Sequence, residues 1–137
     1  LREEIARQGR TIFEVITIAS LLEKESPREQ DRRIIAGILR KRLGIGMPLQ
    51  VDASVNYVTG KHVTPTASDL AADSAYNTYR VNGLPLGPIA NPGIAAIRAA
   101  IRPESSEYLY YLAAPNGETI FSRTLGEHTA AKNRYLY

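Results

Sequence analysis

Hydrophobic positions recur at helical spacing in the first third of the chain. Residues 11–25, TIFEVITIASLLEKE, carry apolar side chains around most of a helical circumference, which predicts a helix buried on nearly every side. Ser26 and Glu29 then have the spacing of a capping box, so we expect a second helix to begin immediately. Its apolar stripe ends at a glycine, Gly44 or Gly46, which predicts the C-terminal end of that helix.

Shorter elements follow in the middle of the chain. A short helix is expected within residues 47–58, and Thr66 with Asp69 forms another capping box that predicts one or two helical turns. Residues 73–90 follow neither a helical nor a strand period and contain two prolines and two glycines, so we expect a long loop there. Its Tyr, Val, Leu and Ile content indicates that the loop is ordered, and long ordered loops in compact domains are usually functional.

The last third of the chain predicts a helix, a β-hairpin and a final helix. Asn91 with Pro92 is typical of a helix start, and we expect that helix to reach about Ile101. Residues 108–113 and 119–122 read as two strands joined by a turn at an Asn-Gly pair. The segment TLGE then supplies capping residues for a helix that runs to the C-terminus. The predicted fold class is α+β, mostly helical, with a small β-hairpin and a long ordered loop.

The composition suits one globular domain with a core of its own. The chain has 137 residues, of which 44% are hydrophobic and 23% charged, so we expect a single domain over residues 1–137. The net charge of +3 is far from the dense basic surface of a nucleic-acid-binding protein, and we expect no nucleic-acid partner. Because the chain starts at Leu1 without an initiator Met, we expect it to be a piece of a longer protein.

Several classes of site have no basis in the sequence. Cysteine is absent, which excludes disulfides and thiolate chemistry. His62 and His128 are isolated from other ligand-forming residues, so we expect no metal site. Neither the G-x-S-x-G turn of a serine hydrolase nor the G-x-G-x-x-G loop of a dinucleotide site occurs, and we expect no cofactor.

The candidate chemistry lies at the end of the buried helix. Glu23 and Glu25 follow a strongly apolar run, so at least one carboxyl is expected where desolvation raises its pKa and keeps it protonated. Helical periodicity does not separate the two, because both flank apolar positions. A protonated acid facing a loop rich in Tyr and Asn suits a carbohydrate substrate, since it can donate a proton to a glycosidic oxygen at neutral pH.

Four longer segments carry a resemblance to a known family. From residue 16 to residue 133, the chain closely resembles the YceG-like family of bacterial endolytic murein transglycosylases, the MltG proteins. The resembling segments, in order, are ASLLEKES, RLGIGMPLQVDASVNY, AYNTYRVNGLPLGPIANPG and YLYYLAAPNGETIFSRTLGEH. The resemblance implies a lytic-transglycosylase-like domain that cuts nascent peptidoglycan strands and leaves 1,6-anhydro-muramyl ends. It also implies anchoring in the cytoplasmic membrane by an upstream helix, action on the outer face of that membrane, and peptidoglycan synthases as candidate partners.

The same resemblance suggests which residues form the site. Lytic transglycosylases place their acid directly before Ser or a similar small residue at a helix end, so we assign catalysis to Glu25 and keep Glu23 as the fallback. We expect the loop at 73–90 to form one wall of a groove beside the acid. The residues that we assign to substrate binding are Ser26, Gln50, Asp52, Tyr76, Asn77, Thr78, Tyr79, Asn91 and Ser122.

Two other functions stay open from the sequence. A hydrolytic muramidase would need a second acid in the groove, for which Asp52 is the leading candidate. A non-catalytic peptidoglycan-binding module would keep the groove without turnover. A single acid is enough for a lytic transglycosylase, because the C6 hydroxyl of the muramyl residue is its own nucleophile.

Overall fold

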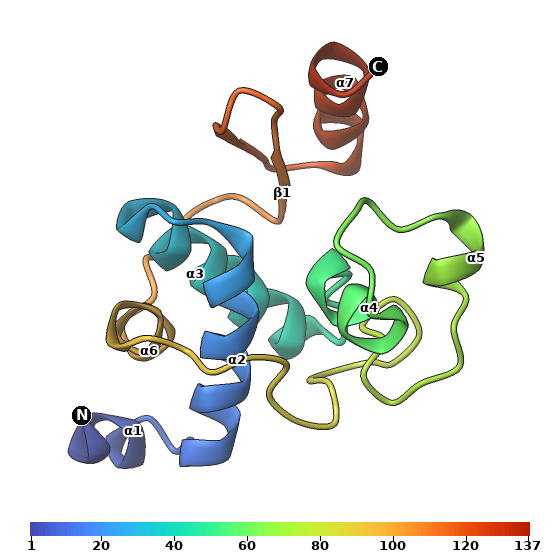
Figure 1. Ribbon diagram of the computed structural model, residues 1–137. Helices are drawn as coiled ribbons and strands as arrows, with labels where there is room; N and C mark the ends of the chain where they lie inside the picture. Colours follow the sequence, from blue (N-terminus) through green and yellow to red (C-terminus); the bar gives the residue numbers. More distant parts are fainter.

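The fold is mostly helical and carries one small hairpin, as Figure 1 shows for the computed structural model of residues 1–137. This is the predicted α+β class. The hairpin is a two-stranded antiparallel sheet in which Tyr111 pairs with Phe121. In chain order the elements are α1 (Arg2–Arg7), α2 (Ile12–Glu25), α3 (Glu29–Ile45), α4 (Asp52–Thr59), α5 (Ala67–Leu70), α6 (Ile94–Ile101), β1 (Tyr110–Ala113), β2 (Thr119–Ser122) and α7 (Leu125–Tyr135).

Helix α2 forms the centre of the molecule, with α3 and α6 packed against it (Figure 1). Seven of its residues are buried, including Ile18, Leu21 and Leu22, which confirms the helix that the apolar pattern predicts. Its N-terminal end is capped by the Thr11 side chain, which accepts a hydrogen bond from the Glu14 amide. Helix α6 faces α2 with several small buried alanines, which let the two backbones approach closely.

Helix α3 begins later than its capping signal predicts. The expected box at Ser26 and Glu29 does not form, because Ser26 has extended backbone and serves as the C-terminal cap of α2. Its hydroxyl accepts a hydrogen bond from the Arg28 amide at 3.2 Å, and Arg28 is the residue before the first turn of α3. The C-terminal end is as expected, since Gly46 adopts the left-handed conformation that stops the helix.

Helix α6 also starts later than predicted, and the reason is tertiary. Its N-terminal cap is Gly93 rather than Asn91, and Gly93 has no side chain to satisfy the free amides of the first turn. The Glu23 carboxylate from α2 takes that role and accepts a hydrogen bond from the Gly93 amide at 2.7 Å. Two smaller differences concern other elements. Strand β1 begins at Tyr110 instead of residue 108. The six-residue helix α1 was not predicted.

The loop at 73–90 is ordered by two buried polar side chains. Asn77 donates to the carbonyls of Leu70 and Ala72, at 2.9 Å each, and accepts from the Tyr79 amide at 3.0 Å. The Thr78 hydroxyl accepts from the Val51 amide at 2.8 Å and so ties the loop to the start of α4. The prediction of a long ordered loop is therefore confirmed, and side chains replace the missing ladder bonds.

A buried cation positions the hairpin and the segment before α4. Arg42 of α3 is only 4% exposed, and its guanidinium donates hydrogen bonds to the carbonyls of Leu109 at 3.0 Å and Leu49 at 2.9 Å. The guanidinium also lies over the Tyr110 ring, 5.2 Å from its centre. Because Leu109 leads into β1 and Leu49 leads toward α4, this one side chain ties both segments to α3.

Candidate active site

The C-terminal end of α2 opens into a cavity of about 400 Å³. Glu25 is the last residue of the helix, is half-buried and lines this cavity. Ser26 directs the chain away from the helix axis, which leaves the Glu25 side chain at the helix end. The lining residues come from α2, α4, the segment after α4, the long loop and β1: Lys24, Glu25, Asp52, Ala53, Asn56, Tyr57, Lys61, His62, Ile89 and Ala113.

The environment of Glu25 favours its protonated form. Burial, and after it the negative charge of Asp52, raises the pKa of this carboxyl from 4.5 to about 8. A hydrogen bond with the Tyr111 side chain opposes this effect and lowers the pKa of Glu25. Burial also raises the pKa of Tyr111 well above its usual value, so this hydroxyl stays protonated and can act as the hydrogen-bond donor. The expectation of an acid with a raised pKa is confirmed for Glu25.

Asp52 lies across the cavity from α2, in the first turn of α4. Its carboxylate accepts a hydrogen bond from the Tyr79 hydroxyl. Burial raises the pKa of Tyr79, and the hydrogen bond to Asp52 raises it further, so Tyr79 acts as a donor to Asp52 and not as an acid. The cavity thus holds two carboxyl groups, and the raised pKa of Glu25 suits it to proton donation at neutral pH.

Glu23 points to a different part of the molecule. Successive helix residues are about 100° apart, so two positions along α2 put its side chain on another face from Glu25. That face meets the N-terminal end of α6, where Glu23 accepts from the Gly93 amide. Glu23 does not line the cavity. The geometry therefore separates the two acids that the sequence left open.

The long loop supports the cavity wall instead of forming it. We expected Tyr76, Asn77 and Tyr79 to line a groove, but Ile89 is the residue of this loop that lines the cavity. Asn77 and Thr78 are fully buried, because their polar atoms hold the loop backbone. The wall itself is α4, and the loop packs behind that helix.

The remaining residues assigned to substrate binding lie outside the cavity lining. Ser26 is buried and bonded to the Arg28 amide, and Ser122 is buried at the end of β2. Gln50 and Asn91 are exposed; Gln50 has a positive φ of 52°, an unusual conformation for a residue other than glycine. Among the residues assigned from the sequence, the structure brings Glu25 and Asp52 together in the cavity lining, and the Tyr79 hydroxyl donates a hydrogen bond to Asp52.

Two aromatic residues near the acid were missed by the sequence analysis. The Tyr111 side chain forms a hydrogen bond with Glu25. Tyr57 lines the cavity, with 50% of its surface exposed. A signal for the second was present, because Ala53 and Tyr57 are four residues apart on a predicted helix, as are Asp52 and Asn56. All four face the cavity, so α4 presents two adjacent rows to it.

Comparison with known proteins identifies the family of this chain. The profile of the YceG-like family matches residues 1–134. The chain belongs to this family. A crystal structure at 2.6 Å of a putative YceG-like protein from Listeria monocytogenes matches with a TM-score of 0.90 and 44% identity, over 96% of this chain and 43% of that chain. The predicted family and fold are confirmed.

Two curated relatives carry the name endolytic murein transglycosylase. The protein from Bacillus subtilis (strain 168) is 43% identical over 136 residues, which is 98% of this chain and 38% of that protein. The protein from Streptococcus pneumoniae serotype 2 (strain D39) is 34% identical over 93% of this chain and 26% of its own length. The chain thus spans well under half of the relatives that it matches.

Proposed function

We propose that this chain is the catalytic part of an endolytic murein transglycosylase. The observation that supports this most directly is Glu25, a half-buried acid whose pKa is raised to about 8 at the edge of an open cavity. The substrate is the β-1,4-linked peptidoglycan strand, cut between muramyl and glucosaminyl residues. The family and the names of the two relatives support the same assignment.

In the first step, Glu25 protonates the glycosidic oxygen as the bond from that oxygen to C1 of the muramyl residue breaks. With a pKa of about 8, roughly nine in ten molecules carry the required proton at pH 7, whereas a carboxyl with the ordinary pKa of 4.5 would carry it in well under one in a hundred. Loss of the proton converts Glu25 to its carboxylate form. The Tyr111 hydroxyl stabilises that carboxylate by its hydrogen bond.

In the second step, the Glu25 carboxylate removes the proton from the C6 hydroxyl of the same muramyl residue. The C6 oxygen bonds to C1 and closes the 1,6-anhydro ring, and Glu25 regains its proton. No water enters the product. The negative charge of Asp52 faces the centre where positive charge develops on the sugar, and Tyr79 holds Asp52 in place.

A hydrolytic muramidase is the second candidate, favoured by the presence of Asp52 in the cavity with Glu25. In that mechanism the second carboxylate activates water or attacks C1. Mass spectrometry of digested peptidoglycan separates the two, because hydrolysis adds one water to the product and cyclisation adds none. Reducing muramyl ends as the main product would overturn the transglycosylase proposal. Strands that are O-acetylated at C6 should resist cleavage, since the internal nucleophile is blocked.

A peptidoglycan-binding module without turnover is the third possibility and is tested by the same digestion. Glu25→Gln keeps the shape of the side chain but removes the acid, so it should bind strands and release no anhydro products. Glu23→Gln should release them as the unsubstituted protein does. If neither variant differed from a wild-type chain that produced no anhydro ends, the binding-module function would replace the enzymatic one.

The proposal includes a place of action. We infer that the full-length protein is held in the cytoplasmic membrane by a segment outside this chain, with the present domain on the extracytoplasmic face, where it acts in cell-wall biogenesis near peptidoglycan synthases. None of the helices in residues 1–137 has the length and apolar character of a membrane span. Fractionation of cells that express the full-length protein, with and without its upstream segment, tests the anchoring.

A further inference from the structure

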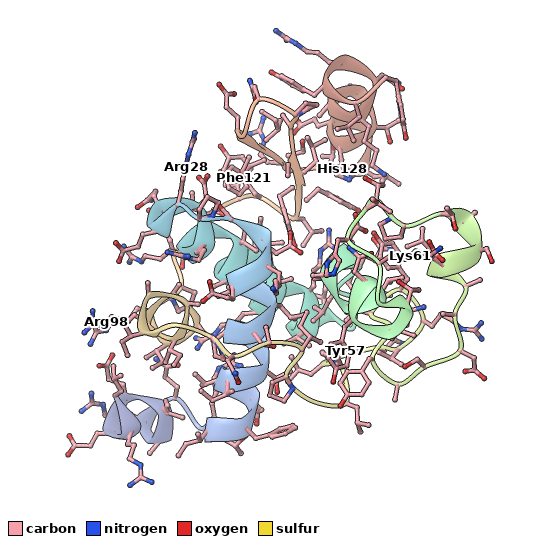
Figure 2. The ribbon with its side chains drawn as sticks, viewed as in Figure 1. Arg28, Tyr57, Lys61, Arg98, Phe121 and His128 are labelled. Atoms are coloured by element: carbon pink, nitrogen blue, oxygen red, sulfur yellow. The ribbon has the colours of Figure 1, made fainter.

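The cavity has an exposed aromatic residue on its α4 wall. Tyr57 is 50% exposed although it lines the cavity, and Figure 2 shows its ring extending from α4 on the side away from the hairpin. Large aromatic side chains normally bury most of their surface in a folded protein. An exposed ring beside a cavity with polar groups is therefore a candidate contact surface for a ligand with a flat apolar face.

The Tyr57 ring packs against an aromatic ring of the long loop. Its centre lies 4.9 Å from the centre of the Tyr76 ring, and the two planes are inclined by 44°. Tyr76 is half-buried and packs against the hydrophobic core, and its amide is held by the Ser74 hydroxyl at 3.1 Å. A ring braced in this way loses little conformational freedom when a ligand stacks on it, which favours binding.

The spacing along α4 matches the spacing of sugars along a strand. Asp52 lies close enough to Glu25 to raise its pKa, and Asn56 with Tyr57 follows one helical turn later along α4 and lines the same cavity. One turn of an α-helix rises about 5.4 Å, close to the length of one sugar unit in a β-1,4-linked chain. A strand that runs along α4 with its scissile bond at Glu25 would place the neighbouring sugar beside Asn56 and Tyr57.

We propose that Tyr57, braced by Tyr76, is a stacking subsite for an N-acetylated hexosamine next to the cleavage point, with the Asn56 amide bonded to its polar substituents. The C–H face of the pyranose covers the tyrosine ring, and the amide can both donate and accept hydrogen bonds at the sugar edge. The inference rests on the proposed function and adds a subsite that sets how the strand is held and how long a strand must be.

The test measures binding without turnover. In the Glu25→Gln background, isothermal titration calorimetry with β-1,4-linked N-acetylglucosamine oligomers of increasing length records the affinity gained with each added sugar. For the chain with Tyr57 intact, the affinity should show a step, a sharp rise at the oligomer length at which one sugar reaches Tyr57. Tyr57→Ala should lose that step, about a tenfold weakening if stacking contributes an aromatic-pair energy, while Tyr57→Phe should retain it.

Two controls separate the subsite from general damage. Val58→Ala removes the neighbouring side chain on α4, which does not line the cavity, and Tyr137→Ala removes an exposed tyrosine elsewhere; both should keep the step. If Tyr57→Ala kept the step, or if the intact chain showed none, the subsite would be wrong. The proposed function would fail separately, through digestion products that do not depend on Glu25.

Discussion

Replacing Glu25 by Gln tests whether the folded protein stabilises the protonated carboxyl. The pKa of Glu25 is raised to about 8 in the folded chain, chiefly by burial and then by Asp52, and returns to about 4.5 when the chain unfolds. Below pH 4.5 both states hold the proton. Between the two pKa values only the folded state holds it, so its stabilising effect is lost as the pH rises toward 8.

The size of the effect follows from the two pKa values. Each pH unit between them costs about 1.4 kcal/mol of unfolding free energy. Through Glu25 alone, the wild-type chain should therefore lose about 3 kcal/mol between pH 4 and pH 7, and about 5 kcal/mol by pH 9. Gln has nearly the same shape and does not titrate. The Glu25→Gln variant should consequently gain stability relative to wild type, and this gain should grow with pH.

The assay is urea unfolding followed by circular dichroism, at several pH values from about 4 to 9. All other titrating groups are common to both proteins, so the difference in unfolding free energy isolates Glu25. Glu4→Gln serves as a control, for which the difference in unfolding free energy from wild type should change with pH in the opposite direction. The hydrogen bond with Arg102 holds the pKa of Glu4 below 4.5, so its contribution is present at neutral pH and is lost as the pH falls. A Glu25→Gln difference that stayed constant with pH would refute an acid held protonated by the fold.

Three further predictions concern neighbouring residues. Asp52→Asn removes a negative charge that raises the pKa of Glu25, so the alkaline limb of the pH profile of kcat/KM should move to lower pH. An alkaline limb that did not move would contradict the coupling between Asp52 and Glu25. Glu23→Ala removes the acceptor for the Gly93 amide and should cost about 1 kcal/mol in urea unfolding without changing the digestion products. Asn77→Ala removes three hydrogen bonds of the long loop, two donated and one accepted by the side chain, and should cost about 3 kcal/mol; an unchanged melting temperature would show that the loop is held by other contacts.

Local signals in the sequence determined most of the elements. The apolar pattern of residues 12–22 specifies α2, because a helix apolar around its circumference is stable only when buried. Gly46 specifies the end of α3, since only glycine adopts the left-handed conformation without steric cost. The Thr66–Asp69 box and the Asn-Gly turn are equally local, and both form as predicted. Signals of this kind act over a few residues, so the sequence alone reveals them.

The tertiary structure decided where those local signals fail and which acid enters the cavity. Ser26 caps the end of α2 instead of the start of α3, and the first turn of α6 is satisfied by Glu23, seventy positions away from Gly93. The pKa of Glu25 depends on Asp52 and Tyr111, which are distant in sequence, and the buried Arg42 guanidinium holds the segments that lead to both residues. Desolvation and charge repulsion depend on what surrounds a group in space. The helical pattern around Glu23 and Glu25 therefore could not show which carboxyl caps a helix and which has a raised pKa. The packing of α4, α6 and the hairpin around the end of α2 separates them.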